Sequence, residues 1–153
     1  MANTYSQIYI QVVFAVQNRK SLIEPSWEED LYKYNTGIVT NKAQKLIAIN
    51  GMPDHIHIFL GMKPDCNLSN LVQEIKKSSD AFIKDSRFSP YKFNWQDGFG
   101  AFSYGHSQID RVVKYILSQK IHHKKVTFKG EYLKLLELFE IPFKEQYLFE
   151  FFG

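Results

Sequence analysis

Two histidines stand one residue apart in PDHIHIFLGM, residues 53–62, a stretch that otherwise has the composition of a buried strand. Successive side chains of a strand point to opposite faces, so His55 and His57 share one face while Ile56 and Ile58 share the other. The isoleucines can enter a core while the two imidazoles converge on one point. Imidazole is a common metal ligand. The stretch therefore predicts a binding site on one face of a strand.

A second set of polar residues lies on a helix predicted over residues 107–125. At about 100° per residue, its apolar residues form one stripe and its polar residues a separate flank. Tyr115 and Gln119 lie one turn apart on that flank, which leaves the Tyr115 hydroxyl available for chemistry. The stripe consists of Ile109, Val112, Val113, Ile116, Leu117 and Ile121, and the flank of Gln108, Arg111, Tyr115, Gln119 and His122.

The two sets together suggest phosphoryl transfer. A metal ion held by His55, His57 and the amide oxygen of Gln119 would keep open positions for a phosphate. A phenol beside it can attack phosphorus, because the cation favours the phenolate. We therefore predict Tyr115 as the nucleophile. The alternative is that the histidines are ordinary strand residues and Tyr115 an ordinary surface tyrosine.

Several neighbouring residues keep two interpretations. Asp54 can cap a hairpin turn or orient a metal ligand. His122 and His123 resemble a metal-binding tract, but adjacent helical residues point about 100° apart, so we expect them to face phosphate or to be structural. Trp95 and Gln96 are either loop anchors or contacts to DNA bases.

The elements that must position these residues follow the order β-α-β-β-α-β. This order predicts a ferredoxin-like or RRM-like α+β sandwich with an antiparallel sheet and additional C-terminal helices, in a single domain over residues 1–153. Asn50-Gly51 is predicted as a hairpin turn. The predicted strands cover residues 4–16, 45–49, 55–62 and 98–105. Two helices are predicted to begin near Pro25 and at Asn67 or Ser69, and two more to cover residues 107–125 and 130–140. A loop is predicted over residues 86–97, and the aromatic tail, residues 146–152, is predicted to dock on the body.

Composition is consistent with a cytoplasmic, single-domain protein. The chain has 153 residues, 44% of them hydrophobic, which suffices for one core. It lacks the run of about 18 apolar residues that a membrane span needs, and a signal peptide is not evident. One cysteine, Cys66, excludes an intramolecular disulfide.

Charge and aromatic content permit a nucleic-acid partner. The formal net charge is +3, and 16% of the residues are aromatic, which suits stacking on unpaired bases. The candidate DNA contacts are Lys76, Lys77, Arg111, Lys120, Lys124 and Lys125.

Two motifs together resemble a known family. His55-Ile56-His57 resembles the HUH motif (histidine, hydrophobic residue, histidine), and YILSQ, residues 115–119, resembles the nucleophile helix of single-tyrosine HUH transposases. These are the short enzymes of insertion sequences of the 200/605 type, with REP-associated tyrosine transposases as relatives. The resemblance extends from TYSQIYIQVVFAV through WQDGFGAFSYGHSQ to the C-terminal helices.

The resemblance implies specific roles. Tyr115 would be the nucleophile, and His55, His57 and Gln119 would hold Mg²⁺ or Mn²⁺. The substrate would be single-stranded DNA that folds into hairpins at element ends. It would be cut without ATP through a 5′-phosphotyrosine intermediate that leaves a free 3′-OH. Family members are homodimers whose sheets join edge to edge, and the tyrosine helix can serve the partner's site in trans.

Two rival functions use the same residues differently. A non-catalytic, domesticated module that binds single-stranded nucleic acid on an RRM-like sheet would explain the fold and the aromatic residues. A relaxase-like or replication-initiator-like nickase would use the same chemistry, but it usually has further domains. The two imidazoles alone would also suit Zn²⁺. If Tyr115 is not the nucleophile, Tyr104 is the next candidate.

Overall fold

The computed structural model describes residues 4–152. The predicted domain span, 1–153, and the prediction that no signal peptide is evident also involve residues 1–3 and 153, which lie outside the described residues. Four antiparallel strands form one sheet in the order β2-β3-β1-β4. This is the order expected for the predicted ferredoxin-like sandwich. The strands are β1 (Tyr9–Ala15), β2 (Lys45–Met52), β3 (His55–Gly61) and β4 (Gly100–Tyr104).

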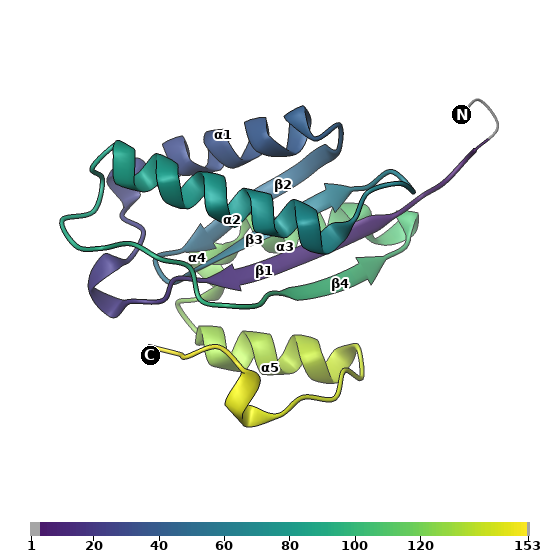
Figure 1. Cartoon of the computed structure of the whole chain (residues 1–153). Helices are drawn as coiled ribbons and strands as arrows, with labels where there is room; N and C mark the ends of the chain where they lie inside the picture. The colour runs from purple at the N-terminus through teal and green to yellow at the C-terminus, as the bar shows by residue number, and fades with distance from the viewer. Residues whose placement is uncertain (1–3, 153) are drawn as a thin grey trace.

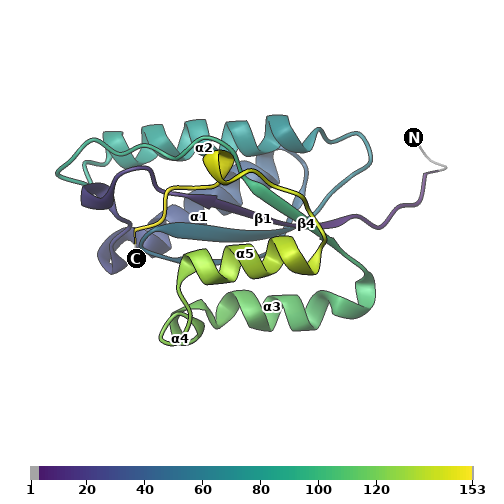
Figure 2. The same cartoon turned by 90° about the horizontal axis from the view of Figure 1, so that it is seen from below.

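Helices cover both faces of the sheet (Figure 1). On one face lie α1 (Pro25–Asn41) and α2 (Leu68–Asp85). On the other lie α3 (Ile109–Leu117), α4 (Gln119–His122) and α5 (Phe128–Leu138). Figure 2, seen from below, shows α3 and α5 next to each other across this second face. Among residues 4–152, no helix has the length and apolar character needed to span a membrane.

The alternation of side chains along β1 and β3 separates a core face from a site face. Val12, Phe14, Ile56 and Ile58 are fully buried, and the Phe14 ring lies under the Lys76 ammonium of α2. The opposite face of β1 carries Gln11, Val13 and Ala15, which pair with Phe59, His57 and His55 of β3. Both predicted histidines therefore lie on the face that α3, α4 and α5 cover.

The hairpin between β2 and β3 turns at Pro53-Asp54 and not at the predicted Asn50-Gly51. Asn50 and Gly51 lie inside β2, where Gly51 pairs with Ile56. A side chain at Gly51 would collide with the carbonyl oxygen of His55, so a glycine is needed for this close approach. The Asn50 side chain donates to the carbonyl oxygen of Ile116 at 3.0 Å, which ties β2 to the end of α3.

The predicted continuous helix over residues 107–125 is interrupted. A short 3₁₀ turn, His106–Gln108, precedes α3, and the chain leaves helical geometry at Ser118 before α4 begins. Leu117 at the end of α3 and Ile121 in α4 are 60% and 68% exposed, although the sequence placed them in the apolar stripe. The same interruption turns Gln119 inward, where it is fully buried.

Helix α5 closes the β4 side of the site face. Thr127 caps its N-terminus by accepting from the amide of Gly130, so the helix begins before the predicted residue 130. Tyr132 packs against Phe102 of β4 with ring centroids 6.4 Å apart, and a Cβ at Gly100 would clash with the Tyr132 ring. The aromatic tail docks as predicted, with Phe149 packed 4.9 Å from the Tyr132 ring. The site is thus enclosed between α3 and α5.

Candidate active site

His55 and His57 converge from β3 as the strand pattern predicts, with ring centroids 5.1 Å apart. Both side chains are fully buried, whereas the sequence suggested rings that line an accessible site. The reason is α5: the Phe128 ring stacks on His55 at 3.8 Å with an interplanar angle of 5°. The two histidines therefore belong to a polar cluster inside the protein.

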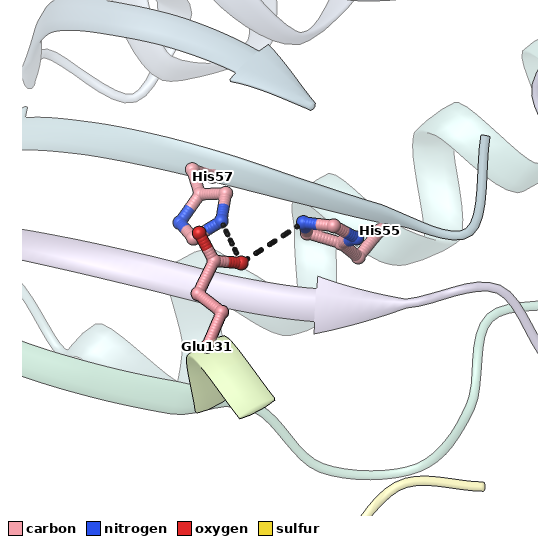
Figure 3. A group of neighbouring side chains, drawn as sticks. All are labelled: His55, His57 and Glu131. Carbon is pink, nitrogen blue, oxygen red and sulfur yellow. Dashed lines mark hydrogen bonds and ion pairs between the residues drawn. The ribbon is translucent and has the colours of Figure 1, made fainter. Parts of the chain in front are cut away.

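Glu131 of α5 lies at the centre of this cluster. Its side chain is only 1% exposed, and its Oε1 atom lies 3.2 Å from His55 Nε2 and 3.1 Å from His57 Nε2 (Figure 3). One ligand atom from each of the three residues lies within 4.8 Å of the others, which is compatible with a shared metal ion.

Sequence reasoning missed Glu131. It is one of several acidic residues in this region, and the helix was predicted to begin only at residue 130. The available signal was its place between Phe128, Tyr132 and Leu135, because a carboxylate within the buried stripe of a helix requires a partner.

Tyr115 and Gln119 join the same cluster from α3 and α4. The Tyr115 hydroxyl donates to Glu131 Oε2, and the Gln119 amide nitrogen donates to the same oxygen at 2.9 Å. Gln119 Oε1 lies 3.1 Å from His55 Nε2, and the Tyr115 ring stands perpendicular to His57 with centroids 5.8 Å apart. All four residues predicted for the site therefore meet within one chain.

His123 enters the cluster although the sequence placed it outside a metal site. Its Nε2 lies 3.0 Å from Glu131 Oε1 and 3.1 Å from Gln119 Oε1, and its side chain is 5% exposed. His122 is 30% exposed and lies 3.5 Å from the other carboxylate oxygen. The argument from helical spacing failed because the two imidazoles reach different oxygens of the same carboxylate, Oε1 for His123 and Oε2 for His122.

Outer hydrogen bonds orient the two strand histidines. Asp54 Oδ1 lies 2.7 Å from His55 Nδ1, which supports its role as an orienting partner. The Gln11 amide nitrogen lies 2.8 Å from His57 Nδ1, and the Tyr104 hydroxyl donates to Gln11 Oε1 at 2.7 Å. Burial raises the pKa of Tyr104 to about 12. Tyr104 thus contacts His57 only through Gln11, whereas the Tyr115 hydroxyl bonds Glu131 directly, so Tyr115 stays the first candidate nucleophile.

The cluster concentrates negative charge on Glu131 and keeps Tyr115 protonated. Burial alone would raise the pKa of Glu131, but its hydrogen bonds with His123, His55 and His57 hold that pKa well below its usual range. Burial and the neighbouring Glu131 carboxylate raise the pKa of Tyr115 well above its usual range. Formation of a phenolate at Tyr115 therefore requires additional positive charge.

The two strand histidines respond to the cluster in opposite directions. Burial lowers the pKa of His57. Burial acts in the same direction on His55, but hydrogen bonds to Asp54 and Glu131 more than offset it, so the pKa of His55 is raised. The carboxylates of Asp54 and Glu131 thus favour the charged form of His55, whereas burial favours the neutral form of His57.

The six candidate DNA contacts do not form one surface. Lys76 donates to the carbonyl oxygen of Gln96 at 2.9 Å, and Lys120 donates to Gly51 at 2.6 Å and pairs with Glu28 at 3.1 Å. These two lysines are therefore engaged within the protein. The exposed members are Lys77 on α2, Arg111 on α3, and Lys124 and Lys125 after α4.

Trp95 and Gln96 act as loop anchors, one of their two predicted roles. The Trp95 indole donates to Ser79 Oγ at 2.9 Å in the core. The Gln96 side chain donates to the carbonyl oxygen of Glu150 at 2.8 Å and accepts from its amide at 2.7 Å. They fix the loop before β4 and the C-terminal segment.

The fold and the cluster point to the class of transposases. A family model described as "Transposase IS200 like" matches residues 4–119, and the chain belongs to that family.

Solved structures share its fold. A transposase candidate from Deinococcus radiodurans R1 is 17% identical with a TM-score of 0.60, covering 76% of this chain and 94% of that one. A REP-associated tyrosine transposase bound to a REP hairpin is 18% identical with a TM-score of 0.61, covering 81% and 73%. A comparison with curated proteins finds no significant match.

Proposed function

We propose that this family member cuts and rejoins single-stranded DNA at insertion-sequence ends, with Tyr115 as the nucleophile. His55, His57 and Gln119 would hold a divalent cation, Mg²⁺ or Mn²⁺. The observation that carries the proposal is the convergence of the Tyr115 hydroxyl and the two histidines on one buried carboxylate, Glu131. Two imidazoles and an amide oxygen are suitable ligands for such an ion.

In the proposed reaction, Tyr115 Oη attacks the phosphorus of a DNA phosphodiester. The bond between Oη and phosphorus forms as the bond to the 3′ oxygen breaks, which leaves a 5′-phosphotyrosine and a 3′-OH after that oxygen takes up a proton. Glu131 Oε2 already accepts the hydroxyl hydrogen of Tyr115 and would receive its proton. When bound, the cation would polarise the phosphate and stabilise the phenolate.

The covalent intermediate would conserve the energy of the broken bond. Attack of a 3′-OH on the phosphotyrosine would release Tyr115 and rejoin the DNA without ATP. The hydrogen bond to Glu131 and the packing of the Tyr115 ring against His57 would hold the phenol in place during both steps. Such positioning of a nucleophile is a major source of rate enhancement.

The arrangement of helices argues against the rival binding module. RRM-type modules stack bases on an open sheet. Here α3 packs through Val112 and Ile116 against Phe59, and α5 packs against Phe102. The central aromatic residues of the sheet are therefore covered, and a role in base stacking would require both helices to move.

We retain hairpin DNA and a second copy of the chain as proposed partners. The REP-associated relative is bound to a REP hairpin, which is the type of substrate predicted here. Strand β4 lies at the edge of the sheet, where a second chain could pair with it. Tyr115 reaches the histidines of its own chain, so exchange of α3 is not required to assemble this cluster.

The test is a search for a covalent DNA adduct. Labelled single-stranded DNA from each flank of the coding sequence is incubated with protein and Mg²⁺ or Mn²⁺ and then denatured. We expect a stable adduct with the wild type and with Tyr147→Phe, an exposed control, and none with Tyr115→Phe. An adduct that persists in Tyr115→Phe would place the nucleophile elsewhere. DNA binding without an adduct under any divalent ion would favour the binding module.

A further inference from the structure

Three imidazoles surround a single carboxylate oxygen. The Nε2 atoms of His55, His57 and His123 lie 3.2, 3.1 and 3.0 Å from Glu131 Oε1. The first two rings are fully buried, and His123 is nearly so. His123 and Glu131 lie beyond residue 119, where the match to the family ends. They therefore add two donor groups to the histidine pair and glutamine that the family motif supplies.

In two of these rings, the outer hydrogen-bond partner determines which nitrogen carries the hydrogen atom. His55 Nδ1 lies 2.7 Å from the Asp54 carboxylate, and His123 Nδ1 lies 2.7 Å from the carbonyl oxygen of Val126. Carboxylate and carbonyl oxygens only accept, so each ring carries a hydrogen on Nδ1. In a neutral ring the Nε2 atom then has a free lone pair.

Both of these Nε2 atoms face further acceptors. Gln119 Oε1 lies 3.1 Å from each of them, and its orientation is set by the amide nitrogen, which donates to Glu131. Glu131 Oε1 completes the group. Four lone pairs thus converge without a hydrogen atom between them when the rings are neutral. Such an arrangement requires positive charge, either as protons on the rings or as a bound cation.

We propose that His123 and Glu131 are additional ligands, so that the site binds a transition-metal ion such as Mn²⁺, Co²⁺ or Zn²⁺ in preference to Mg²⁺. Imidazole nitrogen suits these ions, whereas Mg²⁺ prefers oxygen ligands and water. His55 and His123 each donate from Nδ1 to an oxygen, which is the usual arrangement for metal-binding histidines, and His57 reaches the same state when Gln11 turns its amide oxygen toward Nδ1. The proposal deepens the metal site of the proposed function.

The first experiment measures metal binding directly and needs no DNA. Protein stripped with EDTA is titrated with Zn²⁺, Co²⁺ and Mg²⁺ by calorimetry, with the visible bands of Co²⁺ as a second signal. We expect one ion per chain and an affinity for Zn²⁺ on the order of 100-fold or more above that for Mg²⁺. Equal affinities for Zn²⁺ and Mg²⁺, or no binding of Zn²⁺, would overturn the proposal.

Variants identify the added ligands. We expect His123→Ala and Glu131→Gln to weaken Zn²⁺ binding by more than about tenfold, since loss of an outer partner alone typically costs that much. His106→Ala is the control, because His106 is exposed on the 3₁₀ turn before α3 and lies outside the cluster. Unchanged Zn²⁺ affinity in His123→Ala would overturn the role of His123.

A measurement on the unmutated protein covers the case in which a variant does not fold. X-ray absorption of the Zn²⁺-loaded wild type should give three imidazole ligands, and a count of two would refute the proposal. The proposed function fails separately. If the protein cuts DNA with Mg²⁺ but binds no Zn²⁺, the transposase mechanism stands and the proposed ligand set is wrong. If the protein binds Zn²⁺ but forms no adduct, the ligand set stands and the proposed function is wrong.

Discussion

Replacement of Glu131 by glutamine should destabilise the fold because it removes the only carboxylate at the centre of the histidine cluster. Glutamine keeps the shape of the side chain but carries no charge, and one of its terminal atoms is a donor. If that donor replaces Oε2, it faces the amide nitrogen of Gln119, which lies 2.9 Å from Oε2 and also donates. If it replaces Oε1, it faces His57 Nε2, which also donates because His57 Nδ1 accepts from the Gln11 amide nitrogen. Either orientation leaves a buried group without a suitable partner.

The expected loss is about 3 kcal/mol, the lower end of the range for breaking a buried charged pair. For a chain of this size it corresponds to a fall in melting temperature of roughly 6–12 °C. The assay is urea unfolding followed by circular dichroism at pH 7 in EDTA, which removes the contribution of metal binding. The midpoint should fall while the denaturant slope stays the same.

The matched control for this change is Glu137→Gln, an exposed glutamate on the same helix. Its free energy of unfolding should stay within about 0.5 kcal/mol of wild type. If Glu131→Gln is equally neutral, the carboxylate does not hold the histidines together in solution. The arguments for both the nucleophile environment and the ligand set would then fail.

Four further predictions concern stability and assembly. Gly51→Ala should lose more than about 2 kcal/mol, since its Cβ would collide with the His55 carbonyl oxygen, whereas Gly37→Ala, which meets no atom within 4 Å, should gain about 0.5–1 kcal/mol. The double variant His55→Ala/His57→Ala should lose at least about 3 kcal/mol in urea unfolding, because both rings are buried, and an unchanged midpoint would contradict that burial. Burial lowers the pKa of Lys76 to about 8, so between pH 8 and 10.5 the unfolded chain binds more protons than the folded one, and stability rises with pH. Relative to Lys76→Met, wild type should therefore gain about 1–2 kcal/mol over this window, after a discount for solvent access, and a constant difference would refute the shift. Light scattering should give the mass of a homodimer, and a monomer at micromolar concentration would contradict the proposed pairing through β4.

Local patterns in the sequence determined the parts of this protein that depend on near neighbours. The alternation in β3 placed His55 and His57 on one face, because side-chain direction in a strand has a period of two. The spacing of Tyr115 and Gln119 placed them on the same side of the chain even though the helix breaks between them. The order of elements was also readable, since each strand and helix has its own apolar period.

Only the tertiary structure decided which other groups complete the site. Glu131 lies 74 residues after His57, and nothing in its immediate neighbourhood distinguishes it from a solvated helix glutamate except the apolar residues around it. Its role depends on α5 packing across the sheet, a contact between distant segments. His123 joins the site because it reaches one oxygen of the Glu131 carboxylate while His122 reaches the other, which helical spacing does not predict. The enclosed cluster, with its single carboxylate and three imidazoles, exists because burial removes water and leaves these groups only one another as partners.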